Sequence, residues 1–192
     1  MLDEFTNLKA SLEEFRDLVI ADAKENLARP QGKYNKPIDA SGKLSKSIKP
    51  EPVVIYPSGA LEFIIKMEHY GAFIDQGVSG VEKKYDTPYS YKSKGGKNGL
   101  KGMPPPSKLD KWIVRRKIAM RDENGKFLPR KSIQFAIAVG VFKNGIKPSM
   151  FFTKPFQKHY KMLPELLAEA YGLDAAELVR LVFMNNKKKQ KK

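Results

Sequence analysis

The beginning of the chain shows a helical spacing of apolar residues. Between residues 2 and 27, apolar side chains recur every three or four positions and charged residues fill the intervals. This period places the apolar positions on one side of a helix, so the pattern predicts one long amphipathic helix. The same stretch holds seven Asp or Glu and only three Lys or Arg. We expect its outer face to repel DNA and to attract a basic neighbour.

Two runs of β-branched and aromatic residues follow, at residues 52–56 and 60–67, on either side of Pro57, Ser58 and Gly59. Apolar runs that flank such a turn are typical of an antiparallel hairpin. In the second run Leu61, Phe63 and Ile65 alternate with more polar positions. We expect these three side chains to face the first helix.

The second half of the chain favours helices. The spacing predicts helices over residues 107–120, 157–171 and 174–184, with Ser107 as the first N-cap and Gly172 between the last two. Residues 132–143 are expected to be helical or extended, and the spacing of their apolar residues favours a helix. The fold class expected is therefore α+β, in which a long N-terminal helix packs on a small antiparallel sheet and additional helices follow. One domain spans residues 1–184. The basic tail, residues 185–192, lacks apolar residues and is expected to be disordered.

A long basic loop, residues 78–106, is rich in lysine and glycine, and it also contains three tyrosines and a block of three prolines. A loop of this length is usually functional or disordered. Three interpretations stay open: a solvated loop, an arm that contacts protein, and a direct contact with nucleic acid. Lysines of the loop and the tail are the candidate contacts to a polyanion: Lys83, Lys84, Lys92, Lys94, Lys97, Lys101, Lys187, Lys188 and Lys189.

The composition narrows the class of protein further. The 192 residues are 41% hydrophobic and 30% charged, as in a soluble globular domain, and no apolar run is long enough to predict a membrane span or a secretory signal. The chain has no cysteine, which excludes disulfides. Its net charge of +15 indicates a polyanion nearby or a surface kept soluble by charge.

Signatures of catalysis are weak. The two histidines, His69 and His159, lie in no metal-ligand pattern, and the glycines at 95–102 lack the spacing of a phosphate-binding loop. Asp122, Asn124 and Gly125 predict a β-turn rather than a calcium loop. We expect no catalytic residue, no metal and no cofactor.

Two segments about 70 positions apart carry the most organised pattern. Residues 68–80 place Tyr70, Phe73 and Ile74 at helical spacing, and Gly77 follows where a helix would end. Residues 146–156 hold an apolar cluster fixed by two prolines, which predicts an extended segment that leads into a helix. We expect the two segments to meet. The candidate interface comprises Tyr70, Phe73, Ile74, Gly77, Met150, Phe151, Phe152, Pro155 and Phe156.

The order of these segments resembles the tail-completion, or neck, family of minor tail proteins of long-tailed bacteriophages. The matching positions are Tyr70, Gly71, Ala72, Phe73, Ile74, Asp75 and Gly77, then Pro148, Phe151, Phe152 and Pro155, together with a segment at residues 40–48 that is similar to a third element of the family. The resemblance covers roughly residues 1–160, except the loop at 78–106, which is longer than is usual in the family.

The resemblance implies a virion structural protein of the head-to-tail junction, assembled in the bacterial cytoplasm and without catalytic activity. It implies a ring of six or twelve copies that joins other phage neck, adaptor and tail-tube proteins around the DNA channel, with packaged double-stranded DNA as a further candidate partner and no membrane. The alternative, favoured by the charge alone, is a cytoplasmic nucleic-acid-binding protein.

Phe151 and Phe152 suggest how such a contact would form. Adjacent residues of an extended segment point to opposite sides. We therefore expect one ring to fill the core of the subunit and the other, with Met150, to pack against a neighbouring subunit.

Overall fold

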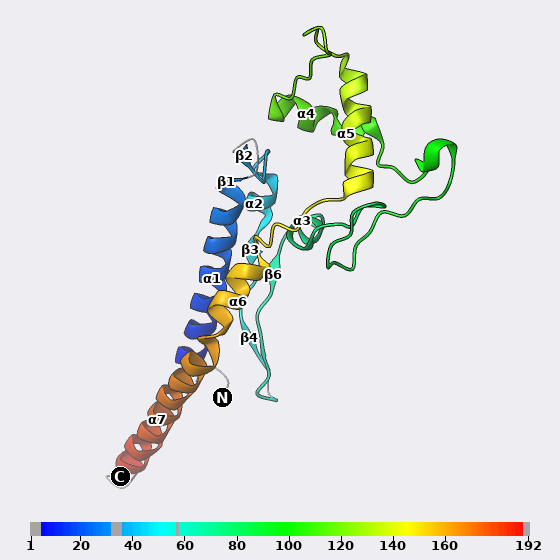
Figure 1. The fold of residues 1–192 in the computed structure, drawn as a ribbon. Coiled ribbons are helices and arrows are strands. Elements are labelled where there is room, and N and C mark those ends of the chain that lie inside the picture. Colours follow the sequence, from blue (N-terminus) through cyan, green and yellow to red (C-terminus); the bar gives the residue numbers. More distant parts are fainter. Residues whose placement is uncertain (1–4, 32–35, 57, 190–192) are drawn as a thin grey trace.

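The computed structural model consists of an elongated body and an arm inserted into it (Figure 1). The structure describes residues 5–31, 36–56 and 58–189, and of these all side chains except those of residues 31, 97 and 183–189. We call residues 78–145 the arm, and the described residues on either side of it the body. The body has the α+β architecture that the sequence predicted: a long N-terminal helix packs on an antiparallel hairpin, and further helices follow.

The N-terminal helix α1, Thr6–Ala28, is the spine of the body. Its buried apolar stripe follows the predicted spacing, and Leu2, the first position of that pattern, lies outside the described residues. Arg16 is the one charged residue buried on this helix. Its Nη1 donates to the carbonyl of Glu51 at 2.8 Å and its Nε pairs with Asp17, so its charge remains satisfied.

The hairpin lies along α1 and is paired at two places. Strand β3 (Lys49–Pro50) pairs with β6 (Ile65–Lys66), and β4 (Val54–Ile55) pairs with β5 (Leu61–Glu62), both antiparallel. Leu61, Phe63 and Ile65 pack with the buried residues of α1, which confirms their predicted direction. A further short pair, β1 (Pro30–Gln31) with β2 (Lys36–Pro37), follows α1, and helix α2 (Lys43–Ser47) buries Leu44 in the core.

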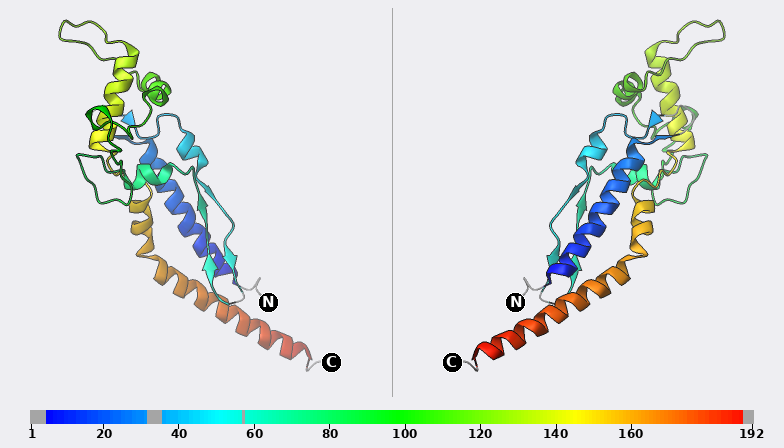
Figure 2. Two further views of the ribbon diagram at one scale, coloured as in Figure 1. Left: turned by 90° about the vertical axis from the view of Figure 1, so that its right-hand side faces the viewer. Right: turned by 90° about the vertical axis from the view of Figure 1, so that its left-hand side faces the viewer.

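The C-terminal helices also pack on the apolar stripe of α1, where Phe15 contacts Phe63 of the hairpin and Phe156 of α6. Helix α6 is Thr153–Tyr160 and helix α7 is Leu163–Lys189, whose C-terminal part extends beyond the body (Figure 2). The predicted break at Gly172 is wrong, because one internal glycine costs only about 1 kcal/mol and its neighbours Ala170 and Asp174 are buried. The predicted disorder is also wrong for residues 185–189, since lysine is a good helix former. Residues 190–192 lie outside the described residues.

The arm has helices and a small core of its own. It contains the short helices η1 (Lys97–Gly99) and η2 (Pro106–Leu109), followed by α4 (Asp110–Arg116) and α5 (Arg130–Asn144). Its buried residues include Ile113, Ile133, Ala138 and Phe142. The helix predicted over 107–120 is shorter, because Lys117 adopts a left-handed conformation (φ 51°), and Ser107 makes no side-chain cap. The helix predicted over 132–143 and the turn at 121–126 are confirmed.

Candidate subunit interface

The two segments singled out in the sequence meet at the base of the arm. Helix α3, Gly71–Gln76, ends beside the N-terminus of α6, and the buried carboxylate of Asp75 accepts hydrogen bonds there. Its Oδ1 accepts from the backbone N–H of Phe152 at 2.8 Å and of Thr153 at 3.2 Å, and its Oδ2 accepts from the Thr153 hydroxyl. Asp75 thus acts as the N-cap of a helix that begins almost eighty positions later.

Backbone hydrogen bonds join the same two segments. Val78 and Ile146 exchange N–H to carbonyl bonds of 2.8 Å each, and the N–H of Met150 donates to the Asp75 carbonyl at 2.9 Å. Gly77, between them, has φ +76°, and a Cβ added to it would lie 2.6 Å from the Ile146 oxygen. The prediction that a glycine must end this helix is therefore confirmed.

A second pair of glycines lets the arm close on itself. A Cβ at Gly80 would lie 2.0 Å from the Lys143 oxygen, and one at Gly145 would lie 2.1 Å from the Val78 oxygen. At this crossing the N–H groups of residues 81–83 donate to carbonyls of the last turn of α5, which a helix end leaves without intrahelical partners. The first crossing thus joins the arm to the body, and the second closes the base of the arm.

The first half of the basic loop is folded rather than solvated. The buried Ser79 bonds through its backbone to Tyr89 and Tyr91 and through its hydroxyl to Tyr85. The Tyr89 ring packs edge-on against Phe73, with 4.6 Å between centroids, and burial raises the pKa of Tyr91 above its usual value. The rings of Tyr89 and Tyr91 therefore pack within the subunit, against Phe73 and Phe142.

The lysines proposed to contact a polyanion are exposed wherever their side chains are described. Lys84 donates from Nζ to the Gly80 carbonyl at 2.7 Å, and the Lys83 ammonium lies 5.5 Å from the Tyr85 ring centroid. Lys92, Lys94 and Lys101 are exposed, whereas the side chains of Lys97, Lys187, Lys188 and Lys189 lie outside the described ones.

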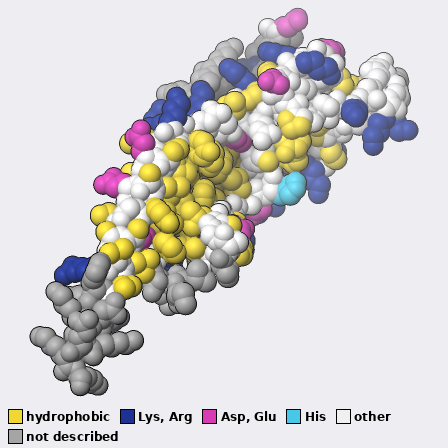
Figure 3. Space-filling model, turned by 90° about the horizontal axis from the view of Figure 1, so that it is seen from below, with side chains coloured by type: hydrophobic (Ala, Val, Ile, Leu, Met, Phe, Trp, Pro, Cys, Tyr) yellow, Lys and Arg dark blue, Asp and Glu magenta, His cyan; other side chains and the backbone are white. Residues whose placement is uncertain are grey.

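Charge is concentrated in the arm as a whole. Residues 78–145 contain sixteen Lys or Arg and five Asp or Glu, a net charge of +11 out of +15 for the chain. Figure 3 shows Lys and Arg mainly towards the end of the molecule opposite the C-terminal helix. The basic surface therefore belongs to a folded arm that includes α4 and α5, and it is larger than the loop and tail lysines that the sequence singled out.

Of the expected split between Phe151 and Phe152, the ring that fills the core is confirmed, the opposite directions of the two rings are wrong, and the contact with a neighbouring subunit stays a prediction. Phe151 is 1% exposed, and Phe152 packs against both apolar clusters of the same body. The chain is not extended here, because it already turns into α6 (Phe152 φ −101°, ψ −46°), and the two rings lie 6.5 Å apart between centroids. Met150 makes this turn with a positive φ of 54°.

An aromatic stripe runs along α6 from the core to the surface. Phe152, Phe156 and Tyr160 recur every four residues and stack in series, with centroids 6.3 Å and 5.7 Å apart. Phe156 also contacts Phe15 of α1 edge-on, at 5.7 Å. Phe152 and Phe156 are half-buried, whereas Tyr160 is 55% exposed. The stripe extends the core of the body into open surface.

Most of the predicted interface residues therefore support the fold of the subunit. Tyr70 and Ile74 pack on the core beside Phe151, Pro155 is buried, and Phe73 contacts the arm. The open apolar surface lies further along, where α6 and α7 expose large side chains: Tyr160, Met162, Tyr171, Leu173, Val179, Leu181 and Val182. Figure 3 shows a broad apolar patch on the lower face of the body. The sequence held one signal for this exposed surface: the apolar residues of the last helix lie on more than one of its faces.

The histidines lie in different surroundings. His159 Nε2 lies 2.9 Å from Asp22 Oδ2, and the Lys158 ammonium donates to the same oxygen at 2.8 Å. The hydrogen bond from Lys158, followed by that from His159, holds the pKa of Asp22 below its ordinary value. His69 is exposed near Phe73. Among the described residues no cluster of His, Asp or Glu could hold a metal ion, and no helix is long and apolar enough to cross a membrane.

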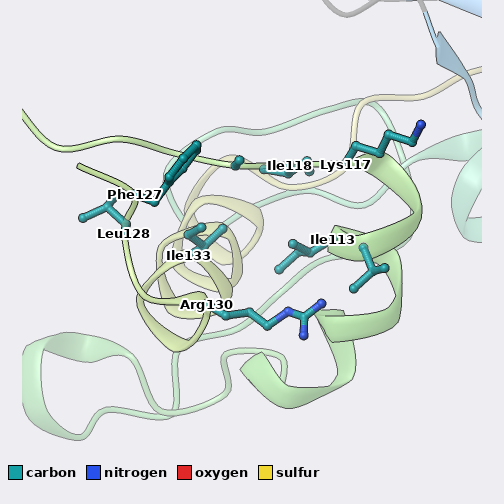
Figure 4. Close-up of a pocket in the computed structure, with 9 residues that line it drawn as sticks. Ile113, Lys117, Ile118, Phe127, Leu128, Arg130 and Ile133 are labelled. Atoms are coloured by element: carbon teal, nitrogen blue, oxygen red, sulfur yellow. The ribbon is translucent and has the colours of Figure 1, made fainter. Parts of the chain in front are cut away.

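A groove of about 330 Å³ opens in the arm between α4, the segments 117–119 and 127–128, and the start of α5 (Figure 4). Apolar side chains of Ile113, Phe127 and Ile133 line it, with Lys117 and Arg130 as its charged lining residues. The groove is the incompletely closed interior of a small helical unit. Its lining lacks the paired acid and base groups that catalysis would need.

Comparison of the chain with protein-family models, with curated proteins and with solved structures finds no match in any of the three.

Proposed function

We propose that this chain is a structural protein of a bacteriophage particle, a neck or tail-completion subunit that joins the head connector to the tail. The observation that carries the proposal is the junction at Asp75. The two segments that resemble the family, although far apart in sequence, form one hydrogen-bonded unit in which the matching acid of the first segment caps the helix of the second. A pattern that arose from common residue types alone would not require the two segments to meet.

The open surface of the body supports a role in assembly. Large apolar side chains of α6 and α7 remain exposed in the single subunit, and contiguous surfaces of this kind mark contacts with other proteins. The arm and the end of α7 project from the body in different directions (Figures 1 and 2). We propose that copies join head to tail into a ring, while α7 and the arm reach neighbouring copies and the adaptor and tail-tube proteins.

The test is to measure the mass of the purified chain, alone and mixed with the portal, adaptor and tail-tube proteins of the same phage. The proposal predicts a closed ring of six or twelve copies, or a defined complex with a connector protein. A Tyr160→Asp/Val179→Asp variant should fold and yet lose this complex, because it places charge on the open apolar face. A chain that stays solitary and ignores every connector protein would contradict the proposal.

The second candidate function is nucleic-acid binding, favoured by the net charge of +11 on the arm. A duplex binder should bind free DNA with an affinity that falls steeply as salt rises, because each neutralised phosphate releases counterions. Tight, salt-sensitive binding to free duplex by a chain that forms no complex with itself or with connector proteins would favour this alternative.

A further inference from the structure

The outer face of α4 gathers cations around a tryptophan. Four residues lie on one side of this helical stretch, opposite the buried Ile113, because their spacings are three, one and three: Lys108, Lys111, Trp112 and Arg115. All four are exposed, Trp112 by 40%. The ion pairs found among the described residues include none of these three cations. We call this surface the basic α4 face.

The outer face of α1 has the complementary character. Five exposed residues lie on one side of this helix, because they are three or four positions apart or adjacent: Glu14, Asp17, Leu18, Ala21 and Glu25. Leu18 is 43% exposed, and the side chains of Asp17 and Glu25 are 60% and 65% exposed. We call this surface the acidic α1 face. Within the chain Asp17 pairs with Arg16 at 2.9 Å and Glu25 pairs with Arg29 at 2.7 Å, and the face stays exposed because α6, α7 and the hairpin pack elsewhere on α1.

We propose that the basic α4 face of one copy binds the acidic α1 face of a second copy of this chain. In this contact the Trp112 indole packs on Leu18 and Ala21 of the second copy. The three cations beside Trp112 then lie at the edge of the contact, where they meet the carboxylates of the acidic α1 face. Tryptophan and arginine are the residues that most often carry the affinity of such contacts. Opposite charge at the rim adds orientation and speeds association.

The two faces belong to different copies for a geometric reason. Arg116 donates from Nη2 to the Ile38 carbonyl at 2.8 Å, which holds α4 beside the segment that follows α1. Figures 1 and 2 accordingly place α4 beyond the C-terminal end of α1, so one chain does not bring its own two faces together. A contact between two different faces is heterologous, and it propagates into a ring when its rotation closes. In this respect the inference rests on the proposed ring.

The experiment is a charge swap read by sedimentation velocity at low and high salt. Lys111→Glu/Arg115→Glu should weaken self-association at least about tenfold, because like charges then face each other across the contact. Glu14→Lys/Glu25→Lys should do the same. The chain that carries all four changes should regain most of the parent affinity. Lys126→Glu/Lys131→Glu, exposed positions elsewhere on the arm, makes the same change in net charge and should leave the affinity within about threefold of the parent.

Several results would overturn the inference. One is a parent chain that stays monomeric. Another is a Lys111→Glu/Arg115→Glu chain that self-associates as well as its control, and a third is a chain with all four changes that does not regain the parent affinity. A reversal that removes binding to duplex DNA and spares self-association would assign the basic α4 face to nucleic acid instead. Binding to connector proteins, measured on the same variants, separates this inference from the proposed function. A failed charge swap with intact connector binding refutes only the inference. A successful swap in a chain that forms no closed ring and binds no connector protein refutes only the virion role.

Discussion

The carboxylate of Asp75 lies 2.8 Å from the backbone nitrogen of Phe152, a residue 77 positions later in the chain. Asp174 of α7 makes the equivalent contact with α1, since it accepts from the backbone N–H groups of Asn7 and Leu8 at 3.0 and 2.9 Å. Neither α1 nor α6 has a side-chain cap from its own N-cap residue. Both helices therefore obtain their first hydrogen-bond acceptors from distant segments, which ties the start of each helix to tertiary folding.

Replacement of Asp75 by alanine should lower the free energy of unfolding by about 1–3 kcal/mol, because it leaves buried N–H donors at the start of α6 without a partner. Urea unfolding followed by circular dichroism measures this loss. Asp86→Ala, at an exposed position of the loop that follows α3, removes the same charge and serves as the control. Equal stabilities of the two variants would show that the cap contributes nothing.

Asp174 should make the stability depend on acidity. Its complete burial would raise the pKa, but hydrogen bonds from the backbones of Asn7 and Leu8 and from the Asn7 side chain outweigh this effect and hold the pKa below the ordinary 3.8. A group whose pKa falls on folding stabilises the native state above its unfolded value, and this contribution is lost as the pH falls through the folded value. Unfolding measured from pH 6 down to about pH 2 should show the loss, and Asp174→Asn should reduce the slope below about pH 4.

Gly145→Ala should destabilise the base of the arm more than Gly125→Ala does. Both glycines have positive φ, 74° and 78°, so both substitutions carry the backbone cost of about 1 kcal/mol. Only at Gly145 does the new Cβ overlap another chain segment, 2.1 Å from the Val78 oxygen, whereas at Gly125 nothing lies within 4 Å. Limited proteolysis should cut the Gly145→Ala chain near residues 78–82 and leave the Gly125→Ala chain intact there. Faster cleavage of the Gly125→Ala chain at residues 78–82 would refute the close contact between Gly145 and Val78.

Phe151→Ala and Tyr160→Ala should separate stability from assembly. Phe151 is 1% exposed, and its truncation should cost about 3–5 kcal/mol through lost burial and the cavity left behind. Tyr160 is 55% exposed at the outer end of the aromatic stripe, so its truncation should change the free energy of unfolding by less than about 1 kcal/mol. Thermal unfolding and complex formation with connector proteins, measured on both variants, check the two roles. A large loss of stability in the Tyr160 variant would show that the ring supports the core of the subunit and not its assembly.

Local periodicity was sufficient to predict the body. The apolar spacing of residues 2–27 and the alternation around Phe63 each describe one face of one element, and the structure buries these faces as expected. The meeting of the two central segments could also be predicted, because a glycine-terminated helix and a proline-fixed strand both need a packing partner. Fold class followed from these elements.

The features that the sequence did not reveal depend on contacts between distant segments. Gly172 ends no helix, because Ala170 and Asp174 pack on α1 on either side of it. The sequence left three interpretations open for the loop after Gly77, because its partners, the last carbonyls of α5, lie more than 60 residues later. Phe152 turns inward because Asp75 draws its N–H group into the helix start, and no local pattern encodes that bond.

The pairing of Val78 with Ile146 brings the two ends of a 67-residue insertion side by side. An insertion that begins and ends at adjacent points can be lengthened, shortened or exchanged while the contacts within the body stay as they are. Selection can accordingly remodel the arm for a new neighbour while the part that holds the subunit together is inherited unchanged.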